Sequence, residues 1–209
     1  MTAERRVMAA SATVRGREVR GRLLAAAAEL IVEVGWSGVS TRMLAERAGV
    51  APGLVHYHFA SVQALLSRAA LDSMHGIVEE FRAQLEGAST PEAALEVILS
   101  ALDGYSGRDP MSLLFVESFL AATRDEELHT ALAAVVADFR ALLARRFAQL
   151  GVAAPDQTAA VVAAAVDGLV LHRALSPGTS AATVTPVLAR LLTPARRQQR
   201  GNRKDRASR

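Results

Sequence analysis

Apolar residues recur at three- and four-residue steps along most of this chain, and this spacing is typical of α-helices that bury one face. One such face, within residues 15–34, comprises Val19, Leu23, Leu24, Ala27, Leu30 and Ile31. The composition agrees, because 51% of the residues are hydrophobic, only 4% are aromatic, and Ala dominates the apolar share. Ala is the best helix former and a poor strand former. The sequence therefore predicts an all-α fold.

Signals for helix starts and ends divide the chain into about nine helices. A Pro follows a capping residue at Thr90 and at Asp109, and Thr123 with Glu126 has the spacing of a capping box. Helices are expected at about 15–34, 41–48 and 52–58, after Ser61, after Thr90, after Asp109, from the capping box to about 150, at 156–175 and at 180–192.

The length of 209 residues allows one domain or two small ones, and the short helices come early and the long ones late. Residues 15–60 are expected to form a small N-terminal domain, and residues 61–192 a larger helical domain. Residues 1–14 show no apolar periodicity and are expected to form a disordered leader. Residues 193–209 carry seven basic residues against one acid and are expected to form a basic disordered tail, with a DNA-contacting arm as the alternative.

Several classes of protein are excluded by what the sequence lacks. Without Cys it offers no disulfide, no Cys-ligated zinc and no catalytic thiol.

No apolar stretch reaches the roughly 20 residues of a membrane span, and no signal peptide is evident, so we expect a soluble, cytoplasmic protein. His56 and His58 point in different directions on a helix, which argues against a shared metal. No catalytic triad, carboxylate pair or phosphate loop stands out, so neither an enzyme nor a cofactor is expected.

Charge is spread unevenly along the chain. Residues 1–60 contain eight Arg against five Glu, a balance of +3, whereas residues 61–192 contain nine Arg against fifteen acids, a balance of −6. A basic N-terminal domain beside an acidic body indicates that a polyanion binds at one end of the molecule.

Residues 39–59 have the pattern of a helix-turn-helix. Ser40 can cap a first helix, Gly49 can end it in the left-handed conformation, and Pro52 can begin a second helix. In such a unit the second helix fits the DNA major groove, although two ordinary packed helices can have the same spacing. The charge distribution favours DNA binding. The expected DNA-contacting residues are Ser40, Thr41, Arg42, Pro52, Gly53, Leu54, His56, Tyr57 and Ser61.

From Arg20 to Leu65 the sequence resembles the DNA-binding domain of the TetR (tetracycline-repressor) family of bacterial transcriptional regulators. The matching features are Arg22-Leu23-Leu24, Ala26-Ala27, Glu33, Gly35-Trp36, Ser40, Arg42, Leu44-Ala45, Ala48-Gly49-Val50, Gly53, His58-Phe59 and Ser61. Asp167-Gly168-Leu169 is similar to a weaker C-terminal signature of many members. The chain departs from the common pattern at Val39, Ala51, His56 and the pair Val62-Gln63.

The resemblance implies three N-terminal helices for DNA and a larger helical body for dimerisation and ligand binding. It implies a repressor that binds a palindromic operator as a homodimer and leaves it when a small-molecule effector binds. An activator or a ligand-independent repressor of the same fold remains an alternative. The rival classes, an enzyme or a purely structural helical protein, are disfavoured by the helix-turn-helix.

The last two helices carry small and branched apolar residues that are expected to form the dimer interface, namely Val161, Ala164, Ala165, Gly168, Leu169, Leu188 and Leu191.

An effector cavity, by the same resemblance, would lie among the middle helices. Its candidate lining is Met74, His75, Tyr105, Met111, Phe115, Phe119, Phe139 and Leu143. These side chains could equally fill an ordinary core. If the cavity exists, its ligand should be a hydrophobic or weakly polar small molecule, with Tyr105, His75 or Glu117 as polar anchors.

Overall fold

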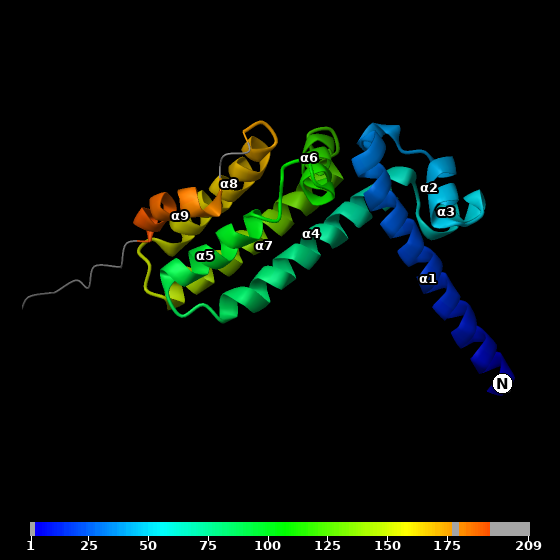
Figure 1. Ribbon diagram of the computed structural model, residues 1–209. Helices are drawn as coiled ribbons and strands as arrows, with labels where there is room; N and C mark the ends of the chain where they lie inside the picture. Colours follow the sequence, from blue (N-terminus) through cyan, green and yellow to red (C-terminus); the bar gives the residue numbers. More distant parts are fainter. Residues whose placement is uncertain (1–2, 177–179, 193–209) are drawn as a thin grey trace, which may run out of the picture.

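The computed structural model describes residues 3–176 and 180–192, with side chains from Val14 on. Within these residues the chain forms nine α-helices, two short 3-10 helices and no strand (Figure 1). The prediction of an all-α fold is therefore confirmed. The predicted tail at 193–209 and the Pro177-Gly178 break between the last two helices lie outside the described residues.

The N-terminal domain contains three α-helices and one 3-10 turn. These are α1 (Ala3–Val34), η1 (Trp36–Gly38), α2 (Thr41–Ala48) and α3 (Pro52–His58). Their apolar faces meet in a small core whose members are each at most 9% exposed: Leu23, Ala27, Leu30, Ile31, Trp36, Val39, Leu44, Ala45, Val55 and Phe59. Burial of this core fixes α2 and α3 against α1.

Helix α1 begins at Ala3, about twelve residues before the start near Arg15 that the apolar pattern predicts. In Figure 1 it extends well past α2 and α3. Residues 3–14 have no apolar stripe, but six of the first eight residues of α1 are Ala, Met or Arg of high helix propensity, and Pro and Gly are absent before Gly16. Periodicity detects a buried face, and a helix without such a face gives no periodic signal.

The body follows with α4 (Val62–Glu86), α5 (Pro91–Leu102), α6 (Pro110–Ala122), α7 (Glu126–Gln149), α8 (Pro155–Arg173), α9 (Ala181–Leu188) and η2 (Ala189–Leu191). Helix α4 runs from the N-terminal domain along the body, where it packs against α7, and α7 packs in turn against α8 (Figure 1). Helix α6 contacts α1 and α7. Two body helices, α4 and α6, therefore adjoin the N-terminal domain.

Side chains cap most of these helices at the residues that the sequence predicts. The hydroxyls of Ser40, Ser61 and Thr90 and the carboxylate of Asp109 each accept a hydrogen bond from a backbone N–H three residues on. Such caps satisfy donors that the first helical turn leaves unpaired.

Helix α7 is capped differently from the prediction. The carboxylate of Asp125 accepts the N–H of Leu128, at 3.0 Å, and the helix begins at Glu126. The hydroxyl of Thr123 instead donates to the carbonyl of Leu120 at 2.7 Å, at the end of α6. The predicted capping box at Thr123 is therefore wrong, because Asp125 supplies an equally good acceptor in the right place.

Candidate DNA-binding surface and effector cavity

The turn between α2 and α3 is built on Gly49, whose φ of 64° and ψ of 43° lie in the left-handed region that favours glycine. The next N–H, that of Val50, donates to the carbonyl of Ala45 at 2.9 Å and closes the end of α2. Pro52 then opens α3, while Ala51 offers it no side-chain cap. The two short helices and this turn form the helix-turn-helix that the sequence predicts.

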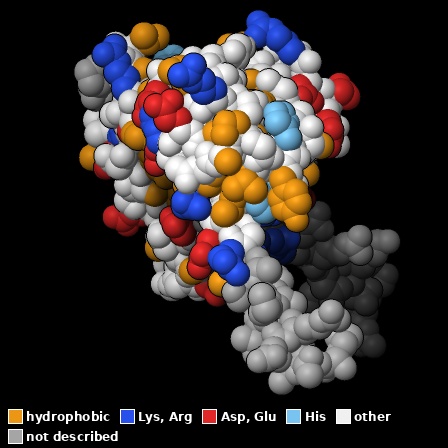
Figure 2. Space-filling model, turned by 90° about the vertical axis from the view of Figure 1, so that its right-hand side faces the viewer, with side chains coloured by type: hydrophobic (Ala, Val, Ile, Leu, Met, Phe, Trp, Pro, Cys, Tyr) orange, Lys and Arg blue, Asp and Glu red, His pale blue; other side chains and the backbone are white. Residues whose placement is uncertain are grey.

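One side of this unit faces solvent. Tyr57 on α3 is 80% exposed, an unusual position for a large aromatic ring, and Arg42 on α2 is also exposed. Pro52, Gly53 and His56 are exposed as well. In Figure 2, which looks onto this end of the molecule, hydrophobic and His side chains lie together, with basic and acidic side chains around them. These predicted residues are therefore all open to solvent on α2 and α3.

The remaining predicted DNA contacts lie at the edges of this solvent-facing side. Leu54 and Thr41 are half-buried, and the Thr41 hydroxyl lies 3.5 Å from Nε2 of His56. The hydroxyls of Ser40 and Ser61 are exposed but accept the capping N–H groups of their own helices, at 3.3 and 3.0 Å. We expect these two Ser residues to position α2 and α4.

Three Arg residues of the domain stabilise its structure. Arg47 pairs with Glu29 at 2.9 Å and with Glu33 at 2.6 Å, and this hydrogen bonding raises the pKa of Arg47 and lowers that of Glu33. Arg20 donates to the His58 carbonyl at 3.2 Å and stacks on a Phe ring, and Arg22 donates to the Gly49 carbonyl at 3.4 Å.

Arg42 differs from these three residues. It has no hydrogen bond or ion pair with any part of the chain that the structure describes. Its guanidinium therefore stays available to a phosphate or a base edge.

Trp36 joins the N-terminal domain to the body. Its backbone N–H donates to Oε2 of Glu117 on α6 at 2.8 Å, and its indole N–H donates to Oε1 of Gln63 on α4 at 2.6 Å. The sequence identifies Trp36 as a core residue, and it is 8% exposed. Its two partners were missed, because hydrogen bonds across 27 and 81 residues leave no local pattern. Gln63 is one of the departures from the family pattern, and this contact gives it a structural role.

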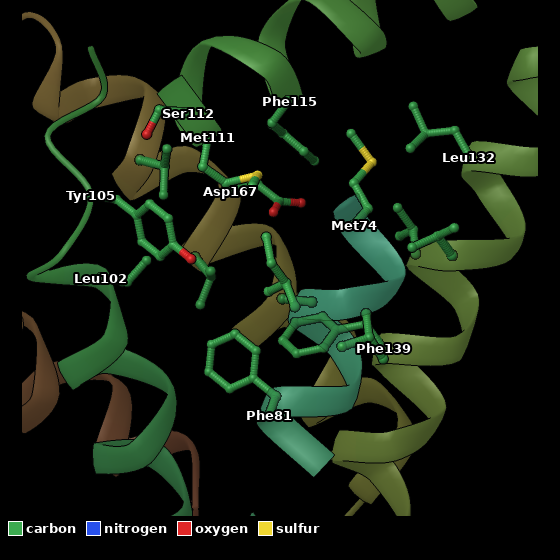
Figure 3. Close-up of a pocket in the computed structure, with 17 residues that line it drawn as sticks. Met74, Phe81, Leu102, Tyr105, Met111, Ser112, Phe115, Leu132, Phe139 and Asp167 are labelled. Atoms are coloured by element: carbon green, nitrogen blue, oxygen red, sulfur yellow. The ribbon is translucent and has the colours of Figure 1, made fainter. Parts of the chain in front are cut away.

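A cavity of about 140 Å³ lies within the body, between α4, the loop before α6, α6, α7 and α8 (Figure 3). Five of the eight predicted ligand residues line it, namely Met74, Tyr105, Met111, Phe115 and Phe139. The other lining residues are mostly apolar, such as Phe81, Leu102, Leu132 and Val166. The middle helices are therefore not packed solid at this point.

Asp167 on α8 brings a carboxylate to this apolar lining. Figure 3 shows it beside Phe115 and Met111, with its oxygens toward the interior. Burial raises the pKa of Asp167, and the charge of Arg140 partly opposes that effect. The sequence identifies Asp167 only through the Asp-Gly-Leu signature, because its place in the cavity depends on how α8 packs.

Tyr105 reaches the cavity from the loop that joins α5 to α6. Burial raises the pKa of its phenol, and the charges of Glu80 and Asp109 raise it further. The loop is fixed by Gly107, which has a φ of 76° and packs so tightly that an added Cβ would lie 2.5 Å from the backbone N of Ala174.

Phe119, 62% exposed, lines a larger open groove of about 590 Å³ instead. Phe115 and Asp167 border both spaces.

His75 and Leu143, two of the predicted ligand residues, line neither space. His75 is exposed, with its Nδ1 2.7 Å from the Leu71 carbonyl oxygen, and Leu143 is fully buried in the core. Helical spacing predicts that Leu143 faces inward but not which helices pack against it, and no spacing supports His75 as a polar anchor. Glu117, the third expected polar anchor, instead accepts a hydrogen bond from the backbone N–H of Trp36.

The predicted dimer residues lie along one side of α8 and on α9 and η2. Val161 and Ala164 are exposed, while Ala165, Gly168 and Leu169 are half-buried. Of the C-terminal pair, Leu188 is half-buried and Leu191 is 41% exposed. Further exposed apolar residues that the prediction did not include are Leu171, Leu175 and Val187.

Neither a membrane span nor a metal site is evident in the residues described. No helix there combines the length and the apolar content that crossing a bilayer requires. No group of three or more His, Asp or Glu side chains in those residues is placed to hold a metal ion.

A helix-turn-helix joined to a helical body that contains a cavity is typical of a DNA-binding transcriptional regulator. The family model described as "Bacterial regulatory proteins, tetR family" matches residues 23–69, and that of the "Tetracyclin repressor-like, C-terminal domain" matches residues 89–194. The chain belongs to the TetR family, as its sequence predicts.

Known proteins agree with this assignment. An HTH-type transcriptional regulator of Mycobacterium tuberculosis is 28% identical over 176 residues, which cover 81% of this chain and 90% of that one. A crystal structure of a transcriptional regulator from Streptomyces coelicolor is 30% identical with a TM-score of 0.73, covering 84% of this chain and 99% of the other. FadR of Bacillus subtilis, crystallised with stearoyl-CoA, has a TM-score of 0.67 over 82% of this chain and 96% of its own, and at 16% identity it shares the fold alone.

Proposed function

We propose that this protein is a repressor that binds a palindromic operator as a homodimer and releases it when a small molecule enters the body cavity. The observation that carries the proposal is the exposed surface of α2 and α3, where Tyr57 is 80% exposed and Arg42 is exposed without a partner in the described chain. A large aromatic ring held in water suits a surface that is covered in a complex.

The amino-terminal half of α3 would enter the major groove, as recognition helices of this type do. Gly53 supports this reading, because a Cβ added there would meet nothing within 4 Å, so the backbone is open to close approach. Arg42 is placed to contact a phosphate or a guanine edge, and the Tyr57 hydroxyl a phosphate. Such contacts require no catalytic group, and the proposal assigns the chain no enzymatic activity.

Dimerisation would bury the apolar side of α8. Val161, Ala164, Gly168 and Leu171 follow one another at three- and four-residue steps and form a single stripe along the helix, and Leu175 is exposed in the turn just after its end. Gly168 has open space where a Cβ would stand, which lets a second helix come close. A two-fold dimer through this stripe would present two copies of α3 to the two halves of a palindrome.

Effector release would act through Trp36. The cavity is lined by Met74 on α4 and Phe115 on α6, and the same two helices hold Trp36 through Gln63 and Glu117. A ligand that moves either helix would strain or break these hydrogen bonds and shift the N-terminal domain. The ligand must then bind the released conformation more tightly than the operator-bound one, and a hundredfold preference corresponds to about 2.7 kcal/mol.

The cavity favours a ligand-responsive regulator over the ligand-independent alternative. Its apolar lining fits the hydrophobic or weakly polar effector that the sequence predicts. A regulator that acts on chromosomal DNA would work in the cytoplasm.

The proposal is tested with DNA from immediately upstream of the protein's own gene. We expect retardation of this DNA in a gel and of no unrelated fragment of equal length. Because several phosphates would be neutralised per dimer, affinity should fall by roughly three orders of magnitude between about 50 and 200 mM salt. A protein that retards no upstream fragment at low salt would contradict the proposal.

A further inference from the structure

We propose that the cavity takes a small apolar amine, whose ammonium group pairs with the carboxylate of Asp167 while its hydrocarbon part fills the space among Phe115, Met74 and Phe139. This inference rests on the proposed function of the cavity as the effector site. It names the chemical class of the effector more narrowly, as an amine with a hydrophobic part, than the hydrophobic or weakly polar molecule that the apolar lining suggests.

Asp167 is half-buried, and its carboxylate has no partner within the described part of the chain. No hydrogen bond or ion pair joins it to any residue in 14–176 or 180–192, although its oxygens face the cavity. Moving a carboxylate partly out of water without a partner is costly, and this burial raises the pKa of Asp167. A ligand cation with N–H donors would remove this cost and add a charge-assisted hydrogen bond.

The surrounding charges favour a cation. Among the described residues, Arg140 on α7 is the basic residue whose charge acts on Asp167, and it is exposed, beyond ion-pair distance, on the side of the outer groove. The charges of Glu80 and Asp109 act on the phenol of Tyr105, which also lines the cavity. Of the described residues that line the cavity, Asp167 alone is charged, and none is basic.

The size and the lining limit the ligand further. A cavity of about 140 Å³ compares with the roughly 150 Å³ that holds one benzene molecule in an engineered protein. The rings of Phe81 and Phe139 lie 5.6 Å apart, centre to centre, and aromatic faces also attract an ammonium group. The amine should thus carry a hydrocarbon part of about the size of a single ring.

The test uses the full chain and four probes of one size: benzylamine, benzyl alcohol, toluene and benzoate. Binding is measured by calorimetry and by the fluorescence of Trp36, which is the only tryptophan of the chain and contacts α4 and α6, two of the helices that line the cavity. We expect the order benzylamine, then toluene and benzyl alcohol, then benzoate, with benzylamine at least tenfold tighter than toluene.

Two variants locate the interaction. Asp167→Asn should weaken benzylamine at least tenfold and leave toluene within about twofold of its wild-type affinity. Arg140→Ala, the matched charge change on the other side of the carboxylate, should keep or improve benzylamine binding. The proposal is overturned if benzylamine does not bind at millimolar concentration, if benzyl alcohol or toluene binds equally well, or if Asp167→Asn keeps full affinity for benzylamine.

Failure of this inference and failure of the proposed function give different results. If toluene binds and releases the upstream DNA but benzylamine has no advantage, the cavity is an effector site and the amine assignment is wrong. If benzylamine binds through Asp167 without changing DNA affinity, the amine site stands and effector release is wrong.

Discussion

Removing the Glu117 carboxylate should weaken operator binding without unfolding the DNA-binding domain. Glu117 accepts the Trp36 N–H at 2.8 Å and is the contact through which α6 holds the turn after α1. A hydrogen bond to a charged group contributes about 1.5–3 kcal/mol. Because Glu117 is only half-buried, we expect the lower end of this range for Glu117→Ala, about 1.5 kcal/mol or roughly tenfold in an equilibrium constant.

In the proposed route of effector release, the operator-bound conformation keeps this bond and the released one strains or breaks it. Loss of the bond should therefore lower operator affinity by up to that factor. Fluorescence anisotropy of a labelled operator measures the affinity, and circular dichroism checks that the helices remain. Glu96→Ala is the matched control, since Glu96 is exposed on α5, away from the N-terminal domain. Its affinity should stay within twofold of the wild type.

A double-mutant cycle with Gln63→Ala tests whether the two contacts act through Trp36. Gln63 holds the indole of the same residue at 2.6 Å, so the two losses should not add, with a coupling of at least about 0.5 kcal/mol. Wild-type operator affinity in Glu117→Ala, or strict additivity in the double variant, would refute the coupling route.

The body, the dimer and the cap of α6 each allow a further test. Phe115→Trp should fill the cavity and abolish calorimetric binding of toluene and benzylamine, while gel retardation of the operator stays unchanged; ligand binding at wild-type affinity would show that the cavity is not their site. Gly168→Arg should place a charge in the α8 stripe and give monomers by light scattering, with operator binding lost, whereas a stable dimer would exclude this face. Asp109→Ala should lower the free energy of unfolding by about 1 kcal/mol at pH 7, measured with urea, because it removes the α6 cap. Burial acts to raise the pKa of Asp109, but hydrogen bonds from Ser112 and Ser106 outweigh burial, so the pKa of Asp109 is lowered in the folded protein. The stabilisation by Asp109 should therefore be present above the ordinary pKa of 3.8. It should disappear as the pH falls through the lower pKa of the folded state. An equal loss at pH 2 would contradict this assignment.

The helix-turn-helix could be predicted almost residue by residue, because its signals are local. Ser40, Gly49 and Pro52 each fix a boundary through their own backbone or side-chain chemistry, and α2 and α3 have the predicted bounds. The start of α1 could not be predicted in this way. A helix that buries no face leaves no apolar period to detect.

The cavity could be predicted only in part. Helical spacing identifies a buried face, and Phe115 and Met111 lie where that face borders an empty space. Helical spacing does not separate the residues that line the cavity from Leu143, which lies in a filled part of the core, or from His75, which is exposed. That separation depends on how neighbouring helices pack. Helical spacing likewise gives no signal for contacts between distant segments, such as that of Glu117 with Trp36.

Operator binding by the exposed α2–α3 surface is the central claim, and a quantitative footprint with Arg42→Ala tests it most directly. On the upstream DNA the wild-type dimer should protect a palindrome whose half-sites are one helical turn or more apart. Arg42→Ala should keep the dimer and weaken protection by about 1–3 kcal/mol if the guanidinium contacts a base. Arg68→Ala, an exposed Arg of α4 that pairs with Asp72 at 2.8 Å, serves as the control and should protect the palindrome as the wild type does. Equal footprints for all three proteins, or no protected palindrome at all, would contradict the account.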